Sequence, residues 1–575
     1  MLSRPFRLVV LAGLAGALLT PAAQADVAIA AAPDLGPNVR IFTPQTPAST
    51  IQQQVNSTFS QQERNQFGQQ RMAFLFTPGS YNVNVNVGYY TQVLGLGLSP
   101  DNTNITGSVH AEADWMGGNA TLNFWRGAEN LAVAPNGGND RWAVSQAAPY
   151  RRMHLKGNLA LDDGGWSSGG FISDSRIDGQ IRSGSQQQWY TRDSQIGSWA
   201  GSNWNMVFTG VAGSPGNTFP NPPYTVVANT PVVRDKPFLY VDGAGNWNVF
   251  VPALRTNARG TTWQNGAPAG QSLPISQFFI VKPGTTAAAI NSALAAGQNL
   301  LVTPGVYHLN QTINITRANT VVLGLGLATF VPDNGITALS VSDVDGVKIA
   351  GVLVDAGPAN SQTLVQVGPN GSSANHSANP TSLSDLFVRV GGAGVGKATN
   401  SVVINSGNVI LDHAWIWRAD HGSGVGWTTN TADVGLQVNG NNVTAYGLFV
   451  EHYQRYQTLW NGNGGRTYFY QNEMPYDPPN QGAWMNGSTR GYAAYKVGAN
   501  VTSHEAWGLG SYCNFSTNRS VVADRAFEVP ANAGVRFHSL VTVSLGGAGT
   551  IARVINNTGD TANGSHTVSK VTTFP

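Results

Sequence analysis

Two glutamates stand in the stretch of the chain that is richest in aromatic and polar side chains. Glu451 follows the apolar run 448–450, and Glu473 follows the aromatic run 468–470. The two glutamates are 22 residues apart, which is about the length of one coil of a β-solenoid. Equivalent positions on adjacent coils lie about 4.8 Å apart at the backbone. The two carboxyl groups could therefore flank a single bond of a bound ligand.

Paired carboxyl groups among aromatic and amide side chains are typical of sites that cleave sugars. Aromatic faces stack on pyranose rings, amides bond hydroxyl groups, and the two carboxyl groups act across the scissile bond. Carboxyl groups about 5 Å apart suit a retaining enzyme, and about 6.5–9.5 Å suits an inverting one. The spacing in the sequence fits both. We predict a glycoside hydrolase with Glu451 and Glu473 as the catalytic residues.

Other interpretations of this stretch stay open. A glutamate on a β-solenoid is usually a solvated surface residue, so a non-catalytic polysaccharide-binding protein is one alternative. A polysaccharide lyase on the same fold is another; it would use Lys or Arg as base, and Arg418 is available, but it often needs a calcium-binding acid cluster that the sequence lacks. Asp420, His421 and His452 lack the His/Cys cluster of a metal site. We expect no metal and no cofactor.

The elements that must position these residues are short strands. Runs rich in Val, Ile and Leu recur along the chain between Gly, Asn and Asp, for example at 347–349, 352–354 and 402–404. Their alternation predicts β-structure. Because no long helical pattern separates them, they suit a solenoid better than βαβ units. A β-propeller or a jelly roll is the alternative.

An internal repeat indicates two related halves. The motif Thr-Pro-Gly-x-Tyr at 77–81 recurs at 303–307, and Leu-Gly-Leu-Gly-Leu at 94–98 recurs at 323–327. A helix-like segment precedes each copy, at 49–67 and 285–296, and would cap the first coil. We predict an all-β protein of two tandem right-handed parallel β-helix domains packed side by side, residues 26–265 and 266–575.

Composition and the N-terminus indicate an exported protein. Arg4 and Arg7, the apolar run 8–19 and the small-residue site before Ala25 predict a signal peptide, residues 1–25, cleaved after Ala25, and hence secretion. A net charge of +2 argues against nucleic acid or an anionic membrane as partner. The single Cys513 is expected to be a small buried hydrophobe. We expect a monomer whose partner is a polysaccharide.

Three segments resemble glycoside hydrolase family 55. They are Trp415-Ile416-Trp417-Arg418-Ala419-Asp420-His421, then Glu451-His452, then Gln471-Asn472-Glu473-Met474-Pro475-Tyr476. Members of that family are exo-acting β-1,3-glucanases (laminarinases) that fold as two tandem β-helices and invert the anomeric centre. The resemblance implies that Glu473 is the general acid and that Glu451 positions or activates the hydrolytic water.

The resemblance extends to the first half of the chain, where residues 184–193 are similar to a glutamine segment of that family. It implies that Gln187 or Gln188 binds water or sugar. The remaining residues that we expect to bind the β-glucan substrate are polar or aromatic neighbours of the two glutamates: Gln471, Tyr476, Trp417, Asp420, His421, His452, Trp460 and His504.

Overall fold

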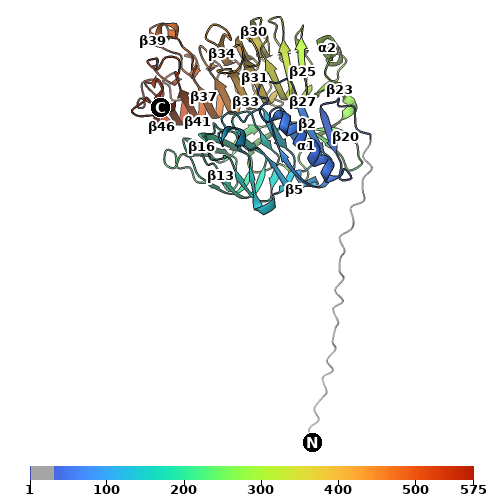
Figure 1. The fold of residues 1–575 in the computed structure, drawn as a ribbon. Helices are drawn as coiled ribbons and strands as arrows, with labels where there is room; N and C mark the ends of the chain where they lie inside the picture. Colours follow the sequence, from blue (N-terminus) through green and yellow to red (C-terminus); the bar gives the residue numbers. More distant parts are fainter. Residues whose placement is uncertain (2–30) are drawn as a thin grey trace.

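The protein consists of two parallel β-helices that lie side by side, as Figure 1 shows for a computed structural model that describes Met1 and residues 31–575. The first β-helix runs from blue to green, and the second from green through yellow to red. The prediction of an all-β chain with two tandem β-helices is thereby confirmed. The apolar run and cleavage site of the predicted signal peptide lie outside the described residues. Among the described residues, no helix combines the length and the apolar character that a membrane span requires.

The first β-helix is built from two parallel sheets. The sheet that faces the second β-helix contains β1 (Val39–Phe42), β2 (Met72–Phe76), β4 (Thr91–Gly95), β6 (Arg126–Glu129), β9 (Tyr150–Arg151), β12 (Phe171–Ser173), β14 (Gln188–Arg192), β16 (Asn205–Thr209) and β17 (Tyr224–Val227). The other contains β3 (Gly79–Asn86), β5 (Thr103–His110), β7 (Ala132–Ala134), β10 (His154–Leu155), β13 (Arg176–Arg182), β11 (Asn158–Ala160) and β8 (Asn139–Arg141), with β15 (Gln195–Ala200) beside β13.

The second β-helix repeats this plan with longer strands. Its sheet facing the first β-helix contains β23 (Phe278–Val281), β24 (Asn299–Val302), β27 (Val321–Pro332), β29 (Lys348–Asp355), β31 (Ser382–Val390), β33 (Ile410–Arg418), β35 (Thr444–Glu451), β37 (Gly465–Glu473), β41 (His504–Cys513), β44 (Val535–Ser544) and the antiparallel β46 (Val568–Phe574), with β25 (Val306–Leu309) beside β27. Its outer sheet contains β26 (Ile313–Ile315), β28 (Leu339–Val341), β30 (Ser361–Val367), β32 (Ala398–Ile404), β34 (Ala432–Val438), β36 (Thr458–Trp460), β40 (Tyr495–Val497) and β43 (Phe527–Glu528).

Short sheets, most of them antiparallel, link the two β-helices and extend from the second. The linking segment holds β18 (Thr230–Val233) with β21 (Arg255–Ala258), and β19 (Phe238–Val241), β20 (Trp247–Pro252) and β22 (Gly270–Pro274). The boundary that we predicted between residues 265 and 266 falls inside this segment, between β21 and β22. Two further pairs are β38 (Met485–Asn486) with β39 (Thr489–Arg490), and β42 (Val522–Ala523) with β45 (Thr550–Ile551).

Both predicted capping helices are present. α1 (Ala48–Gln62) buries Ile51 and Val55, and α2 (Ala287–Ala295) buries Ile290 and Leu294, each against the core of its own β-helix. α1 ends earlier than the predicted residue 67. The chain turns there through Gly68, and Phe67 leaves the helix to stack on Trp417 of the second β-helix.

The repeated Thr-Pro-Gly-x-Tyr motif closes the first coil of each β-helix in the same way. The hydroxyl of Tyr81 donates to the carbonyls of Thr77 (2.8 Å) and Phe42 (3.0 Å). The hydroxyl of Tyr307 donates to the carbonyls of Thr303 (2.7 Å) and Val281 (3.1 Å). The repeat in the sequence is therefore a structural device that ties a coil to the strand before it.

Each β-helix encloses its own apolar core, and inward-facing residues of successive coils stack on one another. Cys513 belongs to the second core, and burial raises the pKa of its thiol to about 12. The expectation that Cys513 is a small buried hydrophobe is confirmed.

A third, mainly aromatic cluster fills the interface between the two β-helices. Trp125 and Phe171 of the first β-helix pack against Trp415, Phe449 and other rings of the second. Buried ion pairs cross the same interface. Arg151 binds the carboxylates of Asp385 and Asp412, both at 2.8 Å.

The interface strands of the second β-helix share a bend at one register position. Asp385, His413, Gly447, Phe469 and Gly508 occupy this position on successive coils, with positive φ angles of 49°, 68°, 58°, 69° and 72°. At Gly447 a Cβ atom would lie 2.7 Å from the Phe171 ring. The glycine is therefore required there by the close approach of the first β-helix.

Candidate active site

A pocket of about 230 Å³ opens between the two β-helices. Its walls include the two glutamates that the sequence singled out, and both β-helices contribute to it. The lining side chains of the first β-helix are Thr121, Leu122, Phe124, Gln146, Ser168 and Gln187, and those of the second are Trp415, Trp417, Asp420, His421, Glu451, His452, Glu473, Tyr476 and Leu545.

The two glutamates occupy equivalent positions on adjacent coils. Glu451 ends β35 and Glu473 ends β37. The two strands pair in parallel with Phe449 opposite Gln471, and the same register two residues later sets Glu451 beside Glu473. The predicted relation between the 22-residue spacing and one coil therefore holds in the structure.

Glu451 lies at the bottom of the pocket and is only 1 % exposed. One carboxylate oxygen accepts a hydrogen bond from Nε1 of Trp415 at 2.7 Å, and the other accepts one from Nε2 of Gln146 at 3.2 Å. An indole and an amide NH₂ can only donate. Both bonds therefore stabilise the ionised form of Glu451 relative to the protonated form.

Glu473 is 9 % exposed and has different neighbours. The hydroxyl of Tyr476 donates to its Oε2, and Nε2 of His452 lies 3.6 Å from the same oxygen. No hydrogen bond to the described residues involves its Oε1. Glu473 thus has one carboxyl oxygen that can hold a proton without displacing a donor.

Burial raises the pKa of both glutamates, and the charge of Glu473 raises the pKa of Glu451 further. The pair consequently retains a proton to a higher pH than isolated carboxyl groups would. The N–H donors on Glu451 counteract this effect at Glu451, and His452 and the Tyr476 hydroxyl counteract it at Glu473. The titration therefore belongs to the pair of carboxyl groups.

Asp420, His421 and His452 form a polar cluster beside Glu473. His452, with φ of 65°, directs Nδ1 at the carbonyl of Met474 (3.1 Å), so that Nε2 faces Asp420 at 3.8 Å as well as Glu473. Burial raises the pKa of Asp420, but both histidines and the hydrogen bond from His421 (2.9 Å) outweigh this effect and lower it to about 2. Asp420 is therefore a permanent negative charge.

Trp417 and Gln187 supply two further walls. Trp417 stacks on Trp415 at a centroid distance of 4.9 Å and packs against the His421 ring at 5.3 Å. Gln187 comes from the first β-helix and lines the same pocket as Glu451 and Glu473. Its Oε1 is buried and has no hydrogen-bond partner among the described residues. This oxygen therefore keeps an unused acceptor at the edge of the pocket.

Known proteins resemble this chain over most of its length. Residues 278–473 match the family model of the LAM55 pectate lyase-like domain. Over 564 residues the chain is 58 % identical to a curated exo-β-1,3-glucanase of Streptomyces sp. (strain SirexAA-E / ActE), covering 97 % of this chain and 92 % of that protein. The chain belongs to glycoside hydrolase family 55.

Solved structures of this family have the same fold. SacteLam55A from Streptomyces sp. SirexAA-E superposes with a TM-score of 0.93 at 59 % identity, covering 94 % of this chain and 99 % of that one. A variant of sacteLam55A with one glutamate replaced by alanine, in complex with glucose, gives 0.93 at 58 % identity and covers 95 % and 99 %. The chain is a glycoside hydrolase.

Two predicted site residues of this family 55 protein lie in the core instead. Trp460 is fully buried and stacks on Tyr495, and His504 packs edge-on against Trp460 at 4.9 Å. Burial lowers the pKa of His504 to about 3, so the imidazole is neutral. The prediction that Trp460 and His504 bind substrate is corrected. The register shows why, because Trp460 stacks between Val438 and Val497 in an inward-facing column.

Gln188 and Gln471 also need a correction. Both are completely buried between the β-helices and neither lines the pocket. Gln188 accepts a hydrogen bond from the hydroxyl of Tyr512, and Gln471 lies against Gly169. Of the two glutamines that the family resemblance left open, Gln187 is the one that faces the pocket.

The remaining side chains that the first β-helix contributes were not predicted from the sequence. Gln146, Ser168 and Phe124 lie on three different coils, so no single motif contains them. Gln146 has a positive φ of 36°, which is unusual for glutamine. No spacing in the sequence marks that conformation.

Proposed function

We propose that this chain is a secreted exo-β-1,3-glucanase that releases glucose from β-1,3-glucan with inversion, using Glu473 as general acid. The observation that carries the proposal is the unequal environment of two buried carboxyl groups on adjacent coils. Glu451 accepts two N–H donors, whereas Glu473 keeps one oxygen free of the protein. The name of the curated Streptomyces relative supports the choice of β-1,3-glucan.

In the proposed reaction, the proton on Glu473 passes to the glycosidic oxygen as the bond to the anomeric carbon breaks. A water molecule attacks that carbon from the opposite face and gives its proton to the carboxylate of Glu451. Gln146 holds Glu451 in place, and the free oxygen of Gln187 can orient the water. A carboxyl group that acts as base on water, rather than as nucleophile, gives inversion.

The shape of the pocket supports exo action. Its volume of about 230 Å³ is below the range of about 300–1,000 Å³ that is usual for ligand sites. Trp417, Phe124 and His421 are among the side chains that line it. Such a pocket can hold the terminal sugar of a chain, whereas endo action needs a cleft that the polymer can cross.

We also propose that the enzyme is exported and acts as a monomer. The signal peptide 1–25 would deliver the enzyme to its insoluble or polymeric substrate outside the cell. Neither nucleic acid nor membrane is a proposed partner, because the net charge is only +2. The N-terminal residue of the protein recovered from culture medium tests this point, and Asp26 is the expected result.

The anomeric form of the first product tests the reaction. Laminarin incubated with the purified protein is expected to release glucose initially as the α-anomer, because a single displacement at a β-linkage inverts the configuration. Proton NMR during the first minutes separates the α-anomer from the β-anomer before they equilibrate. Initial β-glucose would contradict inversion, and oligosaccharides in place of glucose would contradict exo action.

Tyr476→Phe is expected to move the basic limb of the pH profile upward. The Tyr476 hydroxyl lowers the pKa of Glu473 by donating to its ionised form, so its loss raises that pKa further. Activity needs protonated Glu473 and falls as pH rises through this pKa. The limb should therefore shift to higher pH by about one unit. Measuring kcat/KM against pH checks this, and an unchanged or lower limb would contradict it.

A further inference from the structure

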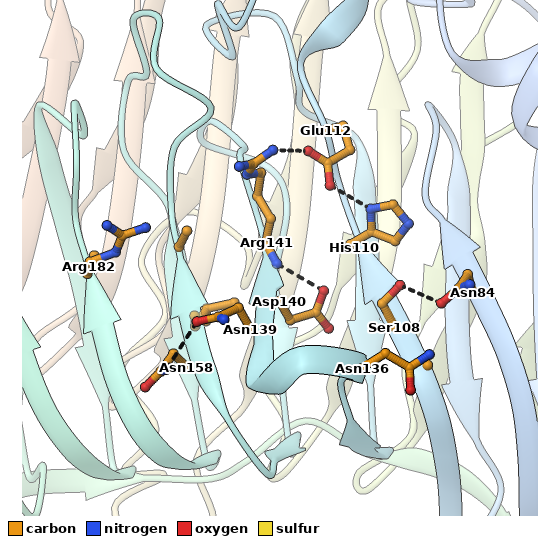
Figure 2. A pocket seen from close by; sticks show the side chains of 13 residues that line it. Asn84, Ser108, His110, Glu112, Asn136, Asn139, Asp140, Arg141, Asn158 and Arg182 are labelled. Carbon is orange, nitrogen blue, oxygen red and sulfur yellow. Dashed lines mark hydrogen bonds and ion pairs between the residues drawn. The ribbon is translucent and has the colours of Figure 1, made fainter.

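A second concave site lies on the first β-helix, on the sheet that does not face the second β-helix. Figure 2 shows this groove, which has a volume of about 310 Å³ and runs across β3, β5, β8, β11 and β13. It shares none of its residues with the pocket that holds Glu451 and Glu473. The proposed reaction therefore does not account for it.

The groove is lined mainly by uncharged groups that both donate and accept hydrogen bonds. Asn84, Ser108, Asn139 and Asn158 form ladders across adjacent strands, with Ser108 donating to Asn84 at 3.2 Å and Asn158 donating to Asn139 at 3.1 Å. Amides and hydroxyls in such rows match the hydroxyl groups of a saccharide.

Asn136 and Arg182 also line the groove, and Figure 2 shows Arg182 at the left and Asn136 at the lower right. Both are exposed, and within residues 31–575 neither side chain has a hydrogen-bond or ion-pair partner. Their donors are thus available to a ligand that lies in the groove between them.

Apart from Arg182, the ionised groups at and beside the groove bind one another, which disfavours an ionic ligand at that end. Oxygens of Glu112, Asp114 and Asp163 lie within 4.8 Å of one another, as a cation site would require. However, Nη1 of Arg141 lies 2.6 Å from Asp163 and is also hydrogen-bonded to Glu112. The guanidinium supplies the positive charge between these carboxylates and is itself neutralised.

The floor of the groove is also uncharged in mildly acidic solution. Asp140 is 7 % exposed, and its carboxyl oxygens accept only from the backbone N–H groups of Arg141 (2.9 Å) and Val109 (3.3 Å). Burial raises its pKa to about 7. Apart from the exposed guanidinium of Arg182 this lining is neutral, and the hydroxyl groups of a neutral saccharide can accept from that guanidinium as well as from the amides.

One loop joins the groove to the active-site pocket. Glu112 lines the groove, and Thr121 and Leu122 on the same loop line the pocket. Asn123 braces the loop by donating to the carbonyl of Glu112 at 2.8 Å. A polymer bound in the groove would therefore contact the loop that also forms part of the pocket wall.

We propose that this groove binds a segment of neutral β-glucan and is a second, non-catalytic contact with the polymeric substrate. The inference rests on the proposed function. The groove would bind a long chain, whereas the pocket cleaves its terminal sugar. Substitutions in the groove should therefore alter the binding of long substrates without altering cleavage.

Asn136→Ala/Arg182→Ala tests the groove in the full-length enzyme. With laminarin as substrate, KM is expected to rise about five- to tenfold, the loss expected for two or more hydrogen bonds, with kcat unchanged. With laminaritriose, which is too short to occupy both sites, KM and kcat are both expected to match the parent. A structural defect would instead change KM or kcat for both substrates alike.

The matched control is Asn500→Ala/Arg259→Ala, which removes an exposed asparagine and an exposed arginine outside the groove. Its KM for laminarin should equal that of the parent. The proposed binding of β-glucan in the groove is contradicted if the groove variant has the KM of the parent on laminarin. It is also contradicted if the variant loses activity on both substrates. A parent enzyme that cleaves neither substrate overturns the proposed function itself, and the groove with it.

Discussion

Glu473→Gln is expected to lower kcat on laminarin by about a thousandfold, because the amide cannot protonate the leaving oxygen and general acids contribute about 10²–10⁴. Folding should be unaffected, since glutamine has the shape of glutamate and can still accept from Tyr476. Initial rates of glucose release and the melting temperature, measured on the same preparation, check both parts. Binding of laminaritriose should persist.

Glu505→Gln is the matched control. Glu505 lies on β41, the next strand of the same sheet, is partly exposed and does not line the pocket. Its replacement should leave kcat within about twofold of the parent, as for surface substitutions away from a site. Retained turnover in Glu473→Gln would remove the general-acid assignment and transfer it to another carboxyl group of the pocket.

Asp412→Ala is expected to destabilise the protein by about 3–5 kcal/mol, the cost of breaking a buried ion pair by removing one partner. The Asp412 carboxylate is completely buried. It accepts from Arg151 at 2.8 Å and from Arg192 at 3.0 and 2.9 Å. Both arginines belong to the first β-helix, so the substitution leaves two buried cations short of a partner at the interface. Urea unfolding measures the free-energy change.

Asp433→Ala provides the comparison for a surface ion pair. Asp433 lies 3.6 Å from Arg455, and the two side chains are 36 % and 58 % exposed. Its replacement should cost less than about 1 kcal/mol. If Asp412→Ala costs no more than Asp433→Ala, the buried ion pairs do not hold the two β-helices together.

The fold could be predicted because its signals are local and repeated. The alternating apolar runs reflect the inward and outward faces of short strands, and the Thr-Pro-Gly-x-Tyr motif appears twice because Tyr81 and Tyr307 close equivalent coils. The end of α1 could not be predicted in the same way. Phe67 leaves the helix to reach Trp417, and a contact over that sequence separation leaves no local pattern.

Spacing along the chain predicted only the part of the site that the second β-helix supplies, whereas Gln187 of the first β-helix was predicted from the family resemblance. Glu451 and Glu473 are related by one coil, so their spacing carries the geometry. Gln146 faces the same pocket from the other β-helix, and its position depends on how two separate solenoids dock. Trp460 was misplaced for a related reason, since an inward and an outward tryptophan look alike until the register is known.

The hydrogen bond from Gln146 to Glu451 joins residues that are 305 positions apart and belong to different β-helices. The rate of turnover should therefore depend on how the two β-helices are aligned along each other. If the first solenoid slid along the second by one coil, about 4.8 Å, each core would stay intact while another side chain came to face Glu451. Such a shift would cause a loss of activity with unchanged strand content. It could occur in a variant in which no residue of the pocket is replaced.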